Sequence, residues 1–131
     1  MNVGRLLSET QRDSDQLRVL IHPIRPESLS LKAASPPMMR LWGPGIQAMT
    51  LKNWIFVDPK ILKGDPDRLA RLVIHELVHA RQWHDYGVVG FLGRYGSDYL
   101  RGRRQGLSHR EAYLNIALEE EARRVQSQVI S

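Results

Sequence analysis

The segment from Asp65 to Gly87 carries the most specific folding signal in the chain, because both of its ends indicate a helix. Asp65 can cap the first turn, Pro66 suits the first helical position, and Asp67 favours the positive end of the helix dipole. Gly87 suits the left-handed position that follows many helices. We therefore expect a helix from Asp65 to about Tyr86.

Two histidines and a glutamate stand in the middle of this predicted helix: His75, Glu76 and His79. Because four residues advance a helix by about 6 Å and return to nearly the same face, the two imidazoles can reach one tetrahedral zinc ion. Glu76 points about 100° away around the helix, which suits a general base better than a third ligand. Burying these three side chains is costly without a partner such as a metal ion, because their neighbours are apolar: Leu69, Leu72, Val73, Ile74, Leu77 and Val78. The alternative is a pair of hydrogen-bonded or half-exposed histidines that bind no metal.

The chain contains no cysteine, and this limits the chemistry of any site. Disulfide bonds, thiolate ligands and a cysteine nucleophile are excluded, so a transition-metal site must use histidine, aspartate and glutamate. Of its 131 residues, 42% are hydrophobic and 25% charged, which is typical of a single globular domain, here residues 1–131. No run approaches the ~20 apolar residues of a membrane span, and Met1–Arg12 lacks the apolar centre of a signal peptide. We expect a cytoplasmic protein without a membrane partner.

The first half of the chain combines a short helix with strands. We expect a short, fraying helix in residues 1–15 and a strand at Leu17–Ile24, where branched apolar residues are frequent. Residues 26–45 hold four prolines and several serines, which predicts an irregular loop. The β-prone runs Ile46–Leu51 and Trp54–Val57, separated by two residues, predict a hairpin.

The second half of the chain is predicted to be mostly helical. Residues 87–106 hold six of the ten glycines, with apolar residues at roughly helical spacing, so a broken helix and a glycine-rich loop are both consistent with the pattern. Ser108 and Glu111 form the pattern of a capping box and open a final helix from about His109 to Gln128. The order of strand, hairpin and helices indicates an α+β fold.

A zinc ion at a hydrolytic site usually takes three protein ligands, and the final helix offers three consecutive glutamates. On helical geometry Glu119 shares a face with Ala122, a small residue that allows close approach to the histidine helix. Glu120 can pair with Arg124, but periodicity does not decide between Glu119 and Glu121. A solvent-exposed acidic run is the alternative.

Two segments together resemble a known family: residues 75–82, His-Glu-Leu-Val-His-Ala-Arg-Gln, and residues 119–122, Glu-Glu-Glu-Ala. From residue 46 to residue 124 the chain resembles the gluzincin side of the zincin metallopeptidases, and more specifically the minimal bacterial zincin-like domains. The resemblance implies a minimal zincin-like fold. Such a fold has a small, mostly antiparallel sheet with a hairpin, an active-site helix and a C-terminal ligand helix.

The resemblance also implies roles for individual residues. His75, His79 and Glu119 resemble the three Zn²⁺ ligands, and Glu76 resembles the catalytic base of a peptidase that acts on peptide or protein substrates. The strand Ile46–Leu51 resembles the edge strand that pairs with an extended peptide. Only twelve residues follow Glu119, which leaves little chain for the lower wall of the cleft and predicts a weak or latent enzyme.

The zincin mechanism also needs a group that stabilises the oxyanion. The candidates are Tyr95, Tyr99, Tyr113, His84 and His109, and among them we favour Tyr99. Gln82, one turn after His79, is either an outer partner of the metal site or a partly exposed helix residue.

Two other functions compete with hydrolysis. The chain could keep the zincin scaffold without catalysis and bind a peptide or partner in the cleft. The formal net charge of +5 also raises the possibility of a nucleic-acid partner, although a solvated face is the better explanation of the basic residues that carry it: Arg94, Arg101, Arg103, Arg104 and Arg110.

Overall fold

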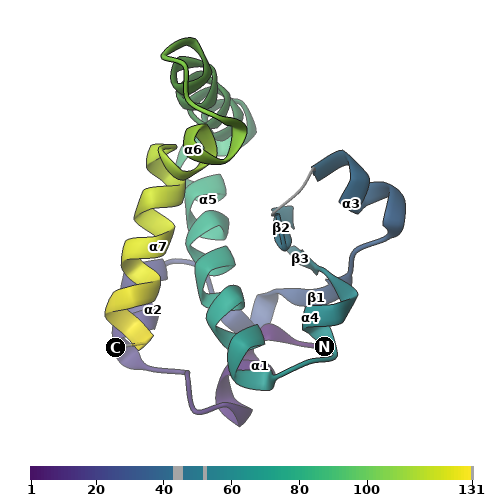
Figure 1. The fold of residues 1–131 in the computed structure, drawn as a ribbon. Helices are drawn as coiled ribbons and strands as arrows, with labels where there is room; N and C mark the ends of the chain where they lie inside the picture. Colours follow the sequence, from purple (N-terminus) through teal and green to yellow (C-terminus); the bar gives the residue numbers. More distant parts are fainter. Residues whose placement is uncertain (43–45, 52, 131) are drawn as a thin grey trace.

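The computed structural model describes residues 1–42, 46–51 and 53–130, and its helices and strands appear in Figure 1. In the described residues the element order is α1 (Val3–Glu9), α2 (Asp15–Ile21), the 3₁₀ turn η1 (Pro26–Ser28), β1 (Ser30–Ala33), α3 (Pro36–Trp42), β2 (Ala48–Leu51), β3 (Trp54–Val57), α4 (Pro59–Leu62), α5 (Pro66–Arg104), α6 (His109–Leu114) and α7 (Ala117–Ile130). This confirms the predicted α+β class.

The three strands form a mixed sheet in the order β1-β3-β2. The predicted hairpin is confirmed, because β2 and β3 pair antiparallel with Thr50 opposite Ile55. Lys52, expected in its turn, lies outside the described residues. The sheet is not mostly antiparallel as predicted, because β1 pairs parallel to β3, with Leu31 opposite Ile55. β2 is an outer strand of this sheet.

The strand predicted at Leu17–Ile24 is wrong, because residues 17–21 belong to helix α2. The hydroxyl of Ser14 caps the helix by accepting a hydrogen bond from the Leu17 amide at 3.1 Å. Only Leu17 and Ile21 of α2 are buried, one helical turn apart, while Val19 is 75% exposed. The branched residues suggested a strand, but the four-residue spacing of the buried pair and the serine cap favour a helix.

The loop predicted over residues 26–45 is also wrong in part, because this stretch contains η1, β1 and α3. Pro36 begins α3, where its missing N–H costs no hydrogen bond. β1 finds its partner in β3, more than twenty residues away. A local pattern could not reveal this pairing. Pro44, the last of the four prolines, lies outside the described residues.

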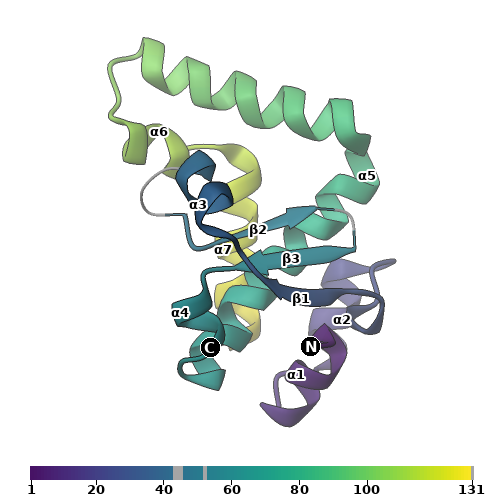
Figure 2. The ribbon, with the colours of Figure 1, turned by 90° about the vertical axis from the view of Figure 1, so that its right-hand side faces the viewer.

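Helix α5 contains the predicted helix and continues beyond Gly87, where the backbone leaves helical geometry with φ 70° and ψ 175°. This conformation is essentially restricted to glycine. The chain then resumes a helix to Arg104, so residues 87–106 are a broken helix rather than a loop. In Figure 2 the C-terminal part of α5 (residues 88–104) turns across the end of the N-terminal part (residues 66–86).

The predicted final helix is split in two. The capping box of Ser108 and Glu111 is present at the start of α6. After Asn115 and Ile116 the chain begins a second helix, α7. The carboxylate of Asp98 accepts a hydrogen bond from the Ala117 amide at 3.1 Å and so satisfies one N–H of the new first turn.

The buried side chains form two clusters. The larger cluster joins α1, α2, the sheet, the N-terminal part of α5 and α7. The smaller cluster has Phe91, Ile116 and Leu118 at its centre, with aromatic side chains of α5 and α6 packed against it. Across the described residues, no helix has the length and apolar character needed to cross a bilayer.

Two glycines of α5 provide a matched test of the break. Added Cβ atoms at Gly87 and Gly93 meet nothing within 4 Å, so the two positions differ mainly in backbone conformation. We expect Gly87→Ala to lower the free energy of unfolding by about 1–3 kcal/mol, because alanine is strained at this φ and ψ. Gly93→Ala should raise it by about 0.5–1 kcal/mol through helix propensity. Urea denaturation followed by circular dichroism measures both values, and a gain in stability from both variants would contradict the break.

Candidate metal centre

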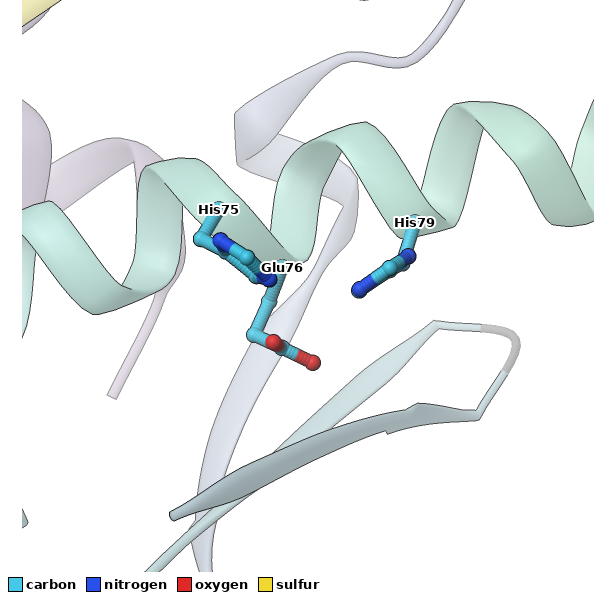
Figure 3. A group of neighbouring side chains, drawn as sticks. All are labelled: His75, Glu76 and His79. Atoms are coloured by element: carbon cyan, nitrogen blue, oxygen red, sulfur yellow. The ribbon is translucent and has the colours of Figure 1, made fainter. Parts of the chain in front are cut away.

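His75, Glu76 and His79 lie close together on one side of the N-terminal part of α5 (Figure 3). One possible ligand atom from each residue lies within 4.8 Å of the other two, so the group could hold a metal ion. His79 and Glu76 are buried and His75 is nearly so. This placement follows from the apolar face of α5, which faces the sheet and α7.

Glu119 of α7 reaches both histidines. Its Oε1 lies 2.9 Å from Nε2 of His75 and its Oε2 lies 3.0 Å from Nε2 of His79. The carboxylate is 4% exposed. Burial raises the pKa of Glu119, but the hydrogen bonds from the two histidines outweigh burial and hold the pKa well below its ordinary value. Glu119 is therefore an anion at neutral pH.

Two tyrosines complete the surroundings of the Glu119 carboxylate. The hydroxyl of Tyr95, from the C-terminal part of α5, donates to Oε2 at 3.0 Å. The hydroxyl of Tyr113, from α6, donates to Oε1 at 3.1 Å. Burial and the negative charge of Glu119 raise the pKa of both tyrosines above its ordinary value, so both hydroxyls keep their protons and act as donors.

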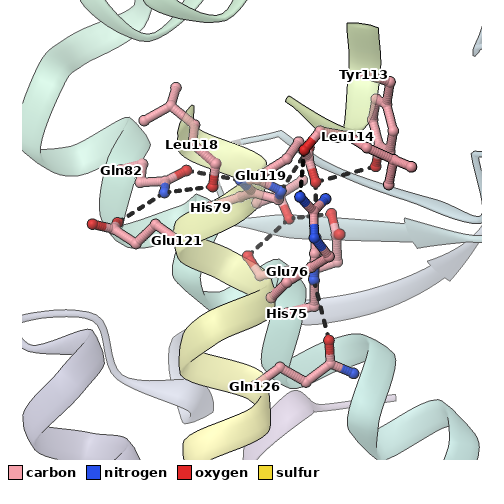
Figure 4. Close-up of polar contacts among 12 residues, drawn as sticks. His75, Glu76, His79, Gln82, Tyr113, Leu114, Leu118, Glu119, Glu121 and Gln126 are labelled. Atoms are coloured by element: carbon pink, nitrogen blue, oxygen red, sulfur yellow. Dashed lines mark hydrogen bonds and ion pairs between the residues drawn. The ribbon is translucent and has the colours of Figure 1, made fainter. Parts of the chain in front are cut away.

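The side-chain amide of Gln82 fixes the orientation of the His79 ring, as Figure 4 shows. Its nitrogen donates to the Leu118 carbonyl at 3.0 Å and to Glu121 at 2.9 Å, so its oxygen must face His79. That oxygen lies 2.8 Å from Nδ1 of His79, which therefore carries the proton. Nε2, the nitrogen that faces Glu119, can donate to that carboxylate as an N–H or, without its proton, can bind a metal ion.

His75 is held in the same manner, with Gln126 of α7 in the role of Gln82. The Gln126 oxygen lies 3.3 Å from Nδ1 of His75. Each histidine thus has a glutamine at Nδ1 and the Glu119 carboxylate at Nε2. Such outer partners set the tautomer and ring orientation of histidine ligands.

The donor set of His75, His79 and Glu119, two imidazole nitrogens and a carboxylate, is one that zinc accepts. If His75 and His79 were neutral with the proton on Nδ1, the lone pair of each Nε2 would face the negative Glu119 carboxylate and repel it. A cation must therefore lie between each Nε2 and Glu119. Burial lowers the pKa of His79, but the hydrogen bond to Glu119 and the charge of Glu76 raise it to about 9, so a proton serves as this cation without a metal. Two ligands each about 2.0–2.1 Å from a tetrahedral zinc are roughly 3.3 Å apart. The separations of 2.9 and 3.0 Å are only a few tenths of an ångström shorter.

The carboxylate of Glu76 is held separately from Glu119. The Thr50 hydroxyl of β2 lies 3.0 Å from Oε1 of Glu76 and 3.1 Å from the Glu76 carbonyl oxygen. Within the described residues, Oε2 of Glu76 makes no hydrogen bond. The sheet therefore positions one carboxylate oxygen of Glu76 and leaves the other available.

Of the candidate oxyanion residues, two contact Glu119, and Tyr99, His84 and His109 make other contacts. The hydroxyl of Tyr99, the favoured residue, lies 2.8 Å from Nδ1 of His109, and His84 pairs with Asp85. Tyr95 and Tyr113 are the tyrosines that the structure brings to Glu119. Sequence spacing could not select them, because their positions depend on the break at Gly87 and on the turn between α5 and α6.

Glu120 and Glu121 take positions away from the two histidines. Glu120 is exposed, and Glu121 accepts a hydrogen bond from Gln82. Glu121 also lies 4.0 Å from Arg124, at the limit of an ion pair. Of the three consecutive glutamates, Glu119 is the one whose carboxylate reaches the histidines.

Comparison with protein-family models, with curated proteins and with solved structures gave no match. The evidence for the site is therefore its geometry: His75, Glu76 and His79 form a group that could hold a metal ion.

Metal content provides the direct test of this site. We expect the wild-type protein to bind about one equivalent of zinc, because the candidate ligand atoms lie within 4.8 Å of one another. His79→Ala and the near-isosteric Glu119→Gln should retain less than a tenth of it. Gln82→Leu should weaken binding by about 10–100-fold, because it removes the partner that orients His79.

The control is His84→Ala, which removes an exposed histidine from the same helix. Inductively coupled plasma mass spectrometry gives the metal content, and circular dichroism shows whether each variant is folded. Equal zinc in folded Glu119→Gln and wild type would remove Glu119 from the ligand set.

Proposed function

We propose that this chain is a zinc-dependent peptide hydrolase. One observation carries the proposal: the Nε2 atoms of His75 and His79 converge on the Glu119 carboxylate, while the Glu76 carboxylate lies beside them as a separate group. His75, His79 and Glu119 would hold the metal. When bound, Zn²⁺ supplies Lewis-acid polarisation of a carbonyl group and lowers the pKa of water.

Glu76 would act as the general base. Thr50 holds its Oε1 at 3.0 Å, and the free Oε2 can accept a proton from an attacking water molecule. The same carboxyl group would then return this proton to the nitrogen of the leaving amine.

Tyr113 is better placed than Tyr99 to stabilise an oxyanion. A pocket of about 340 Å³ adjoins the metal centre, and Tyr113 lines it together with His75 and Glu76. Its hydroxyl is held 3.1 Å from Glu119, so it is already positioned as a hydrogen-bond donor at the centre. Tyr95 contacts the same carboxylate but is not among the residues that line this pocket.

The outer strand β2 offers a place for an extended peptide. Ala48, the first residue of β2, and Gln47 just before it line the pocket that contains His75 and Glu76. A peptide that pairs with the outer edge of β2 would add a fourth strand and bring its backbone to the metal centre. This arrangement favours a peptide substrate.

Replacement of the base separates catalysis from metal binding. We expect Glu76→Gln to retain zinc and to lower kcat for peptide hydrolysis by about 10²–10⁴-fold, because the amide cannot accept the proton. Glu120→Gln, an exposed change of the same kind on α7, should match wild type. Cleavage of a fluorogenic peptide library by Glu76→Gln at the wild-type rate would overturn the proposal. Zinc binding by a wild-type protein that cleaves no peptide would favour a non-catalytic peptide-binding protein.

The two tyrosines provide a second matched pair. We expect Tyr113→Phe to lower kcat about 10²-fold with little change in KM, since it removes the hydroxyl that would turn from Glu119 to donate to the oxyanion. Tyr99→Phe should leave both constants unchanged, because its hydroxyl contacts His109 outside the centre. Steady-state kinetics on the best library peptide measures both, and a larger loss from Tyr99→Phe would restore Tyr99 as the oxyanion residue.

A further inference from the structure

Three arginines line the pocket beside the metal centre. Arg68 and Arg71 come from the first two turns of α5 and Arg123 comes from α7. The pocket has a volume of about 340 Å³ and also includes His75 and Glu76. Positive charge is therefore concentrated within reach of the proposed reaction centre.

The charge of these arginines is only partly neutralised. Arg71 pairs with Asp67 at 3.1 Å, but Arg12 also binds Asp67, at 2.6 Å. Arg68 makes no side-chain hydrogen bond or ion pair with any described residue. Around this pocket the guanidinium groups outnumber the carboxylates available to pair with them.

Arg123 is held in a fixed position at the pocket. Its guanidinium donates a hydrogen bond to the Leu114 carbonyl oxygen at the C-terminal end of α6, and the residue is partly buried. Arg123 therefore keeps further N–H groups for a ligand without first having to be ordered. A fixed guanidinium favours planar anions, and above all carboxylates, which it can bind through two parallel hydrogen bonds.

We propose that this pocket binds a carboxylate of the peptide substrate close to the scissile bond, so that the substrates of this site are acidic peptides. The inference rests on the proposed function for its reaction but on separate residues for its recognition. Side chains of an extended peptide alternate in direction, so a peptide paired with β2 would turn every second side chain toward one face. The pocket begins at Gln47 and Ala48, next to that strand, and has room for one aspartate or glutamate side chain.

Peptide binding to the Glu76→Gln protein tests the pocket without turnover. The probes are tetramethylrhodamine-labelled, C-amidated heptapeptide mixtures of neutral residues with either glutamate or glutamine at the centre. A third probe has central glutamine and a free C-terminus, which distinguishes a side-chain carboxylate from a terminal one. We expect the amidated glutamate probe to bind at least tenfold tighter than the amidated glutamine probe by fluorescence anisotropy, as one charge-assisted hydrogen bond provides. Tighter binding of the free-C-terminus probe alone would contradict the preference for acidic side chains.

The arginine variants assign this preference to the pocket. Arg68→Gln should remove most of the preference without affecting folding, because Arg68 is exposed and unpaired in the described residues. Arg123→Gln should do the same, and Arg123→Lys should restore only part of it. The control is Arg94→Gln, which removes the same charge from the C-terminal part of α5, where Arg94 stacks on Tyr86. It should leave the preference intact.

Equal affinity for all three probes would overturn the inference, and so would an equal loss from Arg68→Gln and Arg94→Gln. The outcomes also separate this inference from the proposed hydrolysis. Cleavage of neutral and acidic peptides at equal rates by wild type and Arg68→Gln refutes the acidic preference and leaves hydrolysis standing. An arginine-dependent preference in binding, without cleavage of any probe by the wild-type protein, supports the pocket and refutes hydrolysis.

Discussion

The carboxylate of Glu119 is the group on which the arrangement of the site depends. It is buried, it contacts Nε2 of both His75 and His79, and it accepts hydrogen bonds from two tyrosine hydroxyls. A buried carboxylate is stable only when positive charge and donors surround it, so these contacts tie α7 to both parts of α5 and to α6. Gln82 extends the same network by fixing the ring of His79. The site is thus a hydrogen-bonded unit built before any ion is added.

The break at Gly87 allows Tyr95 to reach Glu119 and join this network. A straight helix of 39 residues would be about 58 Å long and would carry Tyr95 far from Glu119. The positive φ at Gly87 turns the C-terminal part of α5 back across the fold, which brings Phe91 edge-on to the ring of His79 at 6.1 Å. Phe91 also belongs to the second hydrophobic cluster, which it forms with Ile116 and Leu118.

The sheet contacts Glu76, whereas α6 and the C-terminal part of α5 contact Glu119. Thr50 of β2 positions Glu76, whereas the tyrosines from α5 and α6 position Glu119. This separation keeps the proposed base distinct from the proposed ligand although both are buried glutamates. The arginine pocket opens between these elements, since its lining comes from the start of β2 and from α5, α6 and α7.

The sequence by itself determined the features that depend on neighbouring residues. The cap at Asp65, the capping box of Ser108 and the hairpin were predictable, because each uses contacts within a few positions. The placement of His75, Glu76 and His79 on one helix was predictable for the same reason. Tertiary structure alone decided the parallel pairing of β1, the contact of Glu119 with both histidines, and the choice of Tyr95 and Tyr113 over Tyr99. Most of these features join residues 24 to 44 positions apart. Tyr113 lies only six positions before Glu119, but the two residues belong to separate helices, α6 and α7. The energy of these contacts therefore comes from packing and burial that no local pattern encodes.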